Sequence, residues 1–171
     1  MHLLDTLTTR IKAPKKEVIS VFLDHIPFRH SRIIRLLLSA KGLKFPKSSK
    51  NIENNNNFIL LEYDSHSITF GVAGRFWSYK PDWQRLTRRE FHSFSDPDYA
   101  KIFWKYSFEE TARNETLIRW DTYVVYLSNR SKVKFHTYWE KMAFISRMVR
   151  TFLLFLMKTE INLLLRKNKL K

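Results

Sequence analysis

The chain contains no cysteine in its 171 residues, so disulfide bonds, thiolate nucleophiles and cysteine metal ligands are excluded together. Its six histidines stand at no spacing typical of a metal site, such as His-Glu-x-x-His. Glycine is scarce as well, and two of the three glycines, Gly71 and Gly74, fall within one short motif. We therefore predict a protein without a metal or other cofactor.

Long hydrophobic runs are missing too. The longest, residues 152–157, has Arg150 and Lys158 close by and is far shorter than the ~20 residues of a membrane-spanning helix. Residues 1–5 have neither the basic start nor the apolar stretch of a secretory signal. These features predict a cytoplasmic protein whose contact with a membrane, if it has one, is peripheral.

Acidic residues are outnumbered by basic ones. The chain has 31 Lys or Arg and 16 Asp or Glu, and its formal net charge is +15. Such a field attracts polyanions whatever carries the negative charge, so nucleic acid, an anionic membrane and an acidic partner all fit, as does a merely solvated surface. Because the aromatic residues fall at inward positions, we favour core or cavity lining over base stacking and expect no nucleic-acid binding. Contact with an anionic membrane stays open.

The hydrophobic pattern predicts one α+β domain over residues 1–171. Residues 4–11 alternate loosely and predict a strand, after which Pro14 begins a short helix. A second short helix is expected at residues 33–38, followed by a mobile loop rich in Asn and Lys at 44–57.

From residue 58 to 127 the hydrophobic period changes to two, which predicts an antiparallel meander. The expected strands are residues 58–63, 67–72, 75–79, 88–94, 101–108 and 116–126. We expect Gly71 and Gly74 to shape the turn between the second and third of these strands. Alternation in the last two strands places Trp104, Tyr106 and Trp120 on the inward face of the sheet.

From Lys132 onward the period is helical again. A continuous apolar stripe follows alternate steps of three and four residues: Phe135, Tyr138, Met142, Ile145, Val149, Phe152 and Leu156. A helix with such a stripe must lie against a broad surface, and the concave face of the sheet is the one large enough. The predicted fold is therefore a curved antiparallel sheet wrapped around a long C-terminal helix, with two short helices after the first strand.

Four short segments carry a resemblance to a known superfamily. They are Ala13-Pro14 with Val18, Phe70-Gly71-Val72-Ala73-Gly74-Arg75-Phe76-Trp77, Tyr99-Ala100-Lys101, and Tyr138-Trp139. In this order they resemble the START-like, or SRPBCC, superfamily, which includes polyketide cyclase-like and lipid-transfer proteins, and in particular a mostly uncharacterised bacterial branch of it. The resemblance covers essentially the whole chain. It implies a helix-grip fold with a hydrophobic cavity between the sheet and the last helix.

We predict that this cavity binds a hydrophobic or amphipathic small molecule, such as a lipid, an isoprenoid or a polyketide-like compound, without catalysis. The predicted ligand contacts are inward-facing or lie in the central motif: Phe70, Arg75, Trp77, Trp104, Tyr106, Trp120, Tyr138, Trp139 and Met142. Two alternatives stay open. One is a cyclase- or dehydratase-like enzyme that uses the same cavity, and the other is a basic protein that binds a membrane or nucleic acid.

Arg75 and the pair of Glu90 and His92 each allow more than one interpretation. Arg75 either points into the cavity and holds an anionic ligand group, or forms a structural ion pair with a carboxylate such as Glu62 or Asp121. Glu90 and His92 share one face of an expected strand and are the one pair suited to acid–base chemistry, but we expect them on the solvent side. No catalytic residue is therefore predicted.

Overall fold

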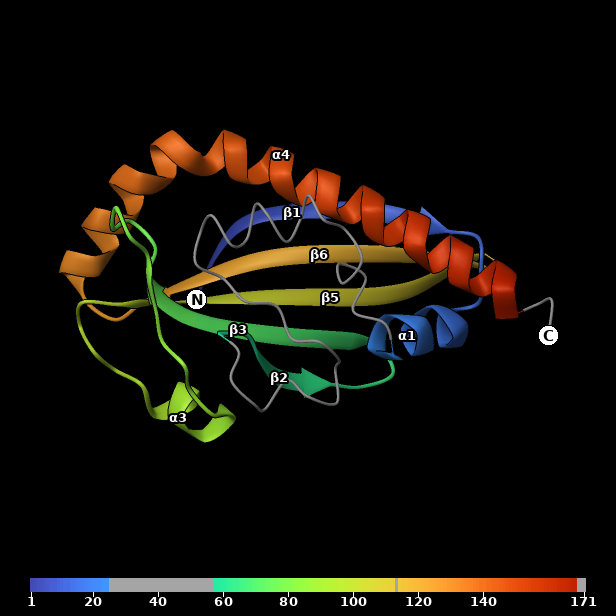
Figure 1. Ribbon diagram of the computed structural model, residues 1–171, viewed down its shortest axis with the longest axis horizontal. Helices are drawn as coiled ribbons and strands as arrows, with labels where there is room; N and C mark the ends of the chain where they lie inside the picture. The colour runs from blue at the N-terminus through green and yellow to red at the C-terminus, as the bar shows by residue number, and fades with distance from the viewer. Residues whose placement is uncertain (25–56, 113, 169–171) are drawn as a thin grey trace.

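A computed structural model describes residues 1–24, 57–112 and 114–168 of the chain. In chain order its elements are β1 (His2–Ile11), α1 (Lys15–Asp24), β2 (Ile59–Tyr63), β3 (Ser67–Arg75), β4 (Asp82–Trp83), α3 (Arg88–Ser93), β5 (Ala100–Ala112), β6 (Glu115–Tyr126) and α4 (Asn129–Asn168), as Figure 1 shows. The helix expected at residues 33–38 and almost all of the loop expected at 44–57 lie outside the described residues.

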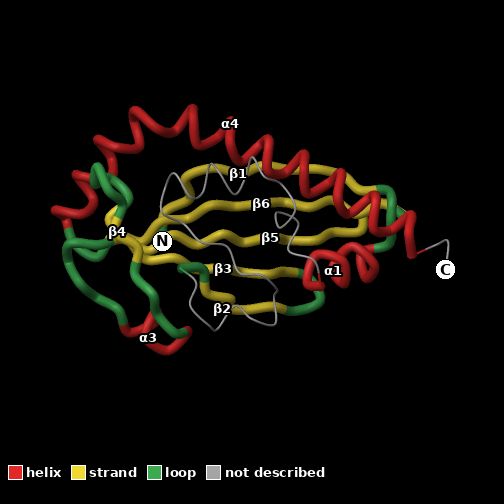
Figure 2. The backbone as a smooth tube through the Cα atoms, in the orientation of Figure 1, coloured by secondary structure: helices red, strands yellow, loops and turns green. Residues whose placement is uncertain are grey.

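The strands form one antiparallel sheet in the order β1-β6-β5-β3-β2, and the short β4 pairs with β3. The sheet is curved and open. Helix α4 runs along its length and contacts β1 and β6, with α1 at one end (Figures 1 and 2). The predicted α+β fold, a curved antiparallel sheet with a long C-terminal helix, is confirmed.

Helix α1 begins where the sequence predicts. The carbonyl of Pro14 accepts hydrogen bonds from the N–H groups of Glu17 at 3.1 Å and Val18 at 3.2 Å, and proline has no N–H of its own to leave unpaired. Val18, Val21 and Phe22 recur at helical spacing and are buried. Their burial in the main core fixes α1 against the sheet and α4.

The core of the described residues has three parts. The largest lies between the sheet, α1 and α4, and includes Trp120 and Met157. A second gathers around Phe135 near the start of α4. The third contains Phe91 of α3, which packs with Leu61 on the opposite face of the sheet. Both faces of the sheet are therefore covered in part, the concave face by α4 and the outer face by α3.

The prediction of a strand at residues 88–94 is wrong, because this segment forms helix α3. A capping box begins the helix: the Thr87 N–H donates to Oε2 of Glu90 at 2.7 Å, and the Glu90 N–H donates to Oγ1 of Thr87 at 3.3 Å. The alternation that suggested a strand reflects one buried residue, Phe91, on a helix of six residues. One buried apolar residue in so short a segment is compatible with the helical period and with the strand period of two.

The prediction of two strands at residues 67–72 and 75–79 is also wrong, since β3 runs without interruption from Ser67 to Arg75. Gly71 and Gly74 lie inside this strand and do not flank a turn. A Cβ atom at position 71 would lie 2.7 Å from Cζ of Phe91, and one at position 74 would lie 2.9 Å from the carbonyl oxygen of Asp82. The two glycines therefore allow α3 and β4 to approach the sheet closely.

The long helix is present, but the predicted apolar stripe does not match its buried face throughout. Phe135 is buried as expected, whereas Ile145 and Phe152 are exposed. The residues that α4 buries in its second half are Arg150, Leu153, Leu154, Met157, Ile161 and Leu165. A strict seven-residue repeat drifts by ~20° per heptad around a straight α-helix, so over the three heptads from Phe135 to Leu156 the predicted stripe turns by ~60° relative to the sheet.

Candidate functional site

The inward face of the sheet carries a stack of aromatic rings. Tyr106 and Trp120 pair across β5 and β6, and their ring centroids lie 5.1 Å apart in a stacked arrangement. Trp104 lies 5.9 Å from Trp120, nearly perpendicular to it, and Phe70 of β3 lies 6.2 Å from Tyr106. Trp120 is only 1% exposed. The predicted inward orientation of Trp104, Tyr106 and Trp120 is confirmed.

The remaining aromatic residues of the predicted site lie nearer the start of α4. Trp77, Tyr138 and Trp139 surround Phe135, and the Trp139 ring stacks on the Phe135 ring at 5.7 Å. Trp104 packs against both this group and the main core, so it joins the two. Met142 is half-buried. The predicted residues other than Arg75 and Met142 thus belong to adjoining aromatic clusters, while an open cavity among them stays a prediction.

Arg75 forms an ion pair with a carboxylate that the sequence reasoning did not single out. Its Nη2 lies 2.6 Å from Oδ2 of Asp82, and its guanidinium stands 5.0 Å from the centre of the Tyr99 ring. The Tyr99 hydroxyl donates to the same Asp82 oxygen at 2.7 Å. This bond, together with the Arg75 contact, lowers the pKa of Asp82. In the structure Arg75 therefore fastens β3 to β4, and its partner is neither Glu62 nor Asp121.

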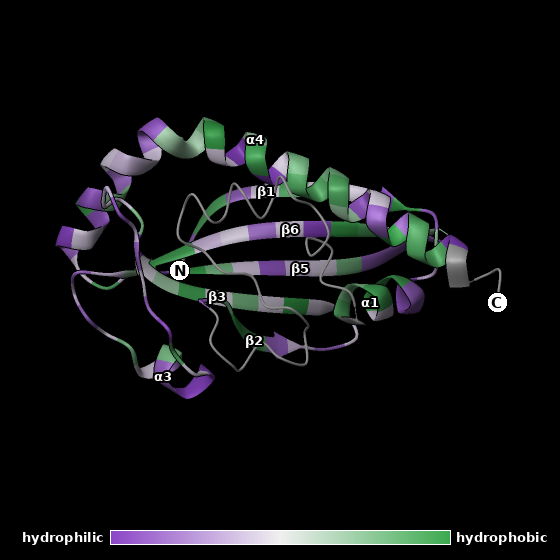
Figure 3. Ribbon diagram, viewed as in Figure 1, coloured by the Kyte–Doolittle hydropathy of each residue, from purple (hydrophilic) through white to green (hydrophobic). Residues whose placement is uncertain are grey.

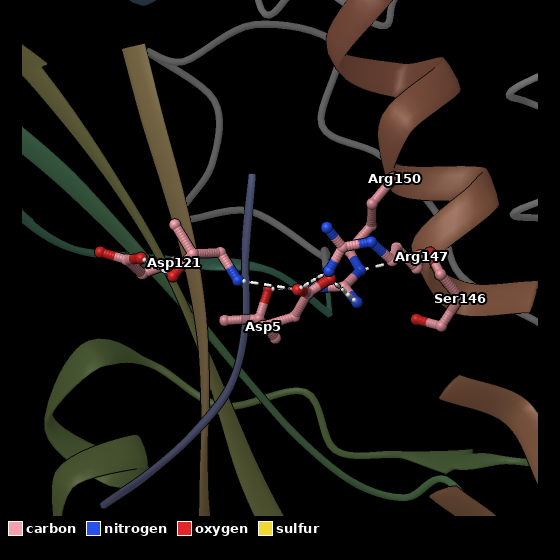
Figure 4. Close-up of polar contacts among 7 residues, drawn as sticks. Asp5, Asp121, Ser146, Arg147 and Arg150 are labelled. Atoms are coloured by element: carbon pink, nitrogen blue, oxygen red, sulfur yellow. Dashed lines mark hydrogen bonds and ion pairs between the residues drawn. The ribbon is translucent and has the colours of Figure 1, made fainter. Parts of the chain in front are cut away.

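A polar cluster under α4 was missed by the sequence reasoning (Figure 4). Arg150 of α4 is only 5% exposed, and its Nη2 donates to Oδ2 of Asp5 in β1 at 2.9 Å. Its Nη1 donates to Oγ1 of Thr122 in β6 at 2.8 Å, and its Nε donates to the carbonyl of Ser146 at 3.2 Å. Arg147, one helical turn before, also pairs with Asp5. One carboxylate thus holds two guanidinium groups between helix and sheet.

The position of Arg150 explains its electrostatics. Burial lowers the pKa of its guanidinium, while the neighbouring Asp5 carboxylate raises it and so opposes that effect. The guanidinium also lies 5.7 Å from the centre of the Trp139 ring. Two residues before Thr122, on the same face of β6, Nε1 of Trp120 is buried and has no hydrogen-bond partner within the part of the chain that the structure describes. The aromatic interior therefore also holds buried N–H donors, those of Arg150 and of Trp120.

The cluster continues through the sheet. The Thr6 N–H donates to Oδ1 of Asp5 at 2.9 Å, and the Thr6 hydroxyl donates to Oδ1 of Asp121 at 2.6 Å. On the outer face, Nε of Arg119 donates to the same Asp121 oxygen at 2.9 Å. Hydrogen bonds therefore link the inner face, which holds Asp5, with the outer face, which holds Asp121. The sequence signal for this arrangement was only a lone Asp in a threonine-rich strand.

A basic pocket lies at the other end of α4, where the helix passes the end of β1. It has a volume of about 410 Å³ and is lined by Arg10, Lys12, Glu115, Lys158, Asn162, Leu165 and Arg166. Glu115 is the one acidic residue in this lining, and it pairs with Arg10 at 3.3 Å. The pocket therefore has an excess of positive charge from Lys12, Lys158 and Arg166.

Glu90 and His92 do not form an acid–base pair. Both are exposed on α3, where residues two apart point in different directions, and the Glu90 carboxylate accepts from Thr87. Within residues 1–24, 57–112 and 114–168 there is no group of three or more His, Asp or Glu side chains placed to hold a metal ion. Over the same residues, no helix is long and apolar enough to cross a membrane.

Comparison with protein-family models and with curated proteins gives no match to this chain. Functional inference therefore depends on the fold and on the side chains described above. Since one fold hosts many activities, the chemistry of the interior and of the surface has to decide between them.

Proposed function

We propose that the protein binds an amphipathic small molecule between the sheet and α4, with the polar head of the ligand near Arg150 and its apolar part against the aromatic rings. The observation that carries this proposal is the buried Arg150, held by Asp5 and Thr122, together with the buried indole N–H of Trp120, which has no hydrogen-bond partner among the described residues. The START-like resemblance of the sequence, with its implied cavity at this interface, points the same way.

Physical chemistry favours a binding role for these donors over a purely structural one. A buried ion pair adds little stability compared with apolar residues of similar volume, so stability alone gives weak reason for Arg150 at this place. A guanidinium has five N–H donors, and the bonds to Ser146, Thr122 and Asp5 use one each. A carboxylate or phosphate head would accept from the others and from Nε1 of Trp120.

The aromatic interior suits the remainder of such a ligand. Phe70, Trp104, Tyr106 and Trp120 present ring faces and edges that bind aliphatic or polycyclic groups without directional demands. We therefore assign the apolar part of the ligand to these residues. Fatty acids, isoprenoid acids and acidic polyketides all have this combination of head and body.

Quenching of tryptophan fluorescence by dibrominated stearate tests the proposal, because bromine quenches only nearby indoles. We expect saturable quenching that unlabelled stearate reverses and that the uncharged methyl ester reproduces only at higher concentration. Trp120→Phe should weaken stearate binding by about threefold to tenfold, the effect of one hydrogen bond. Trp83→Phe is the matched control, because Trp83 lies in the cluster around Phe135, outside the main core.

The proposal fails if quenching does not saturate, or if Trp120→Phe and Trp83→Phe bind stearate equally. Native mass spectrometry of the purified protein provides a second measurement, and we expect a co-purified acidic lipid.

The enzyme alternative has less support from the geometry. A cyclase or dehydratase needs a proton donor or acceptor that is available to the substrate. Asp5 is the acidic residue of the described cluster on the inner face, and its oxygens already accept from Arg147, Arg150 and the Thr6 N–H. Asp5 therefore positions the two arginines, and both of its oxygens are already engaged by these bonds.

A further inference from the structure

The solvent-facing side of α4 carries large apolar side chains over its middle turns. They form the outer α4 patch, which we define as Phe144, Ile145, Met148, Phe152 and Phe155. Phe144 is 73% exposed, Met148 57% and Phe155 61%. Single exposed apolar residues are ordinary, but five within three turns of one helix, spanning about 17 Å, form a continuous surface that indicates a binding partner.

The patch is separate from the face that α4 uses for packing. Leu153, Leu154 and Met157 are buried against the sheet and α1. Figure 3 shows hydrophobic residues on successive turns in the middle of α4, and their exposed or buried side chains place them on its outer and its inner side. Helix α4 is therefore apolar on two sides over residues 144–157, and among the described residues only its inner side packs against other elements.

Basic residues lie at both ends of the patch. Helix α4 contains nine Lys or Arg and two Glu. Lys141 and Lys158 each lie three residues outside the patch, one at either end. Lys158 also lines the basic pocket, whose described lining contains Arg10, Lys12 and Arg166 and a single carboxylate, Glu115. An apolar strip with basic borders is typical of helices that lie in the interface of an anionic membrane.

We infer that the outer α4 patch docks on an anionic lipid bilayer, with α4 parallel to the membrane plane and the basic pocket over the headgroups. The apolar side chains enter the boundary between headgroups and acyl chains, while Lys141 and Lys158 contact lipid phosphates. No described helix is able to cross a membrane, so the contact is peripheral. This inference is independent of the interior ligand site, because none of the patch residues lies on the inner face.

Charge favours the bilayer over a second copy of the chain as the occupant. In an antiparallel pair of helices centred on the patch, Lys141 of one copy would lie opposite Lys158 of the other. Glu140 and Glu160 stand close to these lysines and offset part of the local repulsion between them, but the net charge of +15 on each copy leaves long-range repulsion between two copies. An anionic surface attracts the same charge.

The test uses the full chain with vesicles of phosphatidylcholine alone or mixed with phosphatidylserine. We expect flotation with the mixed vesicles at low salt, and little with phosphatidylcholine alone. Phe144→Ser with Phe155→Ser should reduce the vesicle partition constant by about tenfold or more, since two exposed phenyl rings no longer insert. The matched control is Tyr63→Ser with Tyr79→Ser, which removes two exposed aromatic rings outside α4.

Because the chain has no cysteine, single thiols can report membrane depth. A polarity-sensitive fluorophore at Met148→Cys should shift to the blue on vesicle binding, and one at Ser65→Cys, in the turn after β2, should not. The inference is overturned if the full chain does not float, if the label at position 148 stays in water, or if the tyrosine control loses as much binding. Self-association that Phe144→Ser with Phe155→Ser abolishes would overturn it in favour of a second copy.

Discussion

At the scale of single residues, the Asp5 carboxylate forms ion pairs with two guanidinium groups, those of Arg147 and Arg150. Arg150 is buried, so loss of its partner leaves a charge that water does not reach. We predict that Asp5→Asn lowers the free energy of unfolding by about 3 kcal/mol, near the lower end for breaking a buried pair because the amide still accepts one hydrogen bond. Urea denaturation measures the change.

Glu115→Gln is the matched control for Asp5→Asn. Its partner Arg10 is largely exposed, so this pair should contribute no more than about 1 kcal/mol. Equal losses in the two variants would mean that the Asp5 cluster is as well solvated as a surface pair, and would contradict the role we give it.

Asp82 provides a second prediction at this scale, on pH. Its pKa is lowered in the folded protein, chiefly by the hydrogen bond from Tyr99 and then by that from Arg75. The stabilisation is therefore present above the unfolded value, 3.8, and is lost as pH falls through the folded value below it. We expect Asp82→Asn to be less stable than the native chain at pH 6, with the difference shrinking toward pH 3, the range that thermal unfolding should cover. A difference that stays constant with pH would contradict this.

At the scale of elements, the packing of α3 on the sheet depends on Gly71. A Cβ at this position would come within 3 Å of both Phe91 and Leu61, and Phe91 is fully buried. We predict that Gly71→Ala lowers the free energy of unfolding by about 1–3 kcal/mol through overpacking. In a Phe91→Leu background the same substitution should have a smaller effect, since the smaller side chain leaves room.

Gly74→Ala is the control that shows whether β3 tolerates alanine poorly in general or only where Gly71 contacts Phe91. Its Cβ would meet the backbone carbonyl of Asp82, which Phe91→Leu does not move. The effect of Gly74→Ala should therefore be the same in both backgrounds. Relief of both substitutions by Phe91→Leu would show that α3 does not contact Gly71 specifically.

Strands β5 and β6 were predictable from the sequence, whereas helix α3 and the buried face of α4 were not. The inward orientation of Trp104, Tyr106 and Trp120 follows from the period of two on long strands. In such strands many alternating residues agree on which face is buried. Helix α3 has one buried residue, so periodicity could not identify it, and the capping box at Thr87 and Glu90 was the available signal. Arg150 was beyond prediction because its burial depends on the rotation of α4 over several turns.

At the scale of the whole molecule, the question is whether the charge of +15 acts as a diffuse field or through the basic pocket. Membrane binding through a diffuse field depends on the net charge alone, whereas membrane binding through the pocket depends on the particular side chains that line it. Lys12 and Lys158 line the pocket, while Lys16 and Lys80 do not. We predict that Lys12→Gln with Lys158→Gln weakens binding to phosphatidylserine vesicles by about 2 kcal/mol at low salt, since each lysine near an anionic surface contributes about 1 kcal/mol.

Lys16→Gln with Lys80→Gln removes the same net charge from exposed positions outside the pocket, so it should have a much smaller effect. The difference between the two double variants should vanish at high salt, because screening shortens the reach of every charge. Quenching by dibrominated stearate should be unchanged in both, since neither pair contacts the aromatic interior. Equal losses of vesicle binding would assign membrane attraction to the field of the entire chain, and would leave the outer α4 patch without the local anchor that orients it.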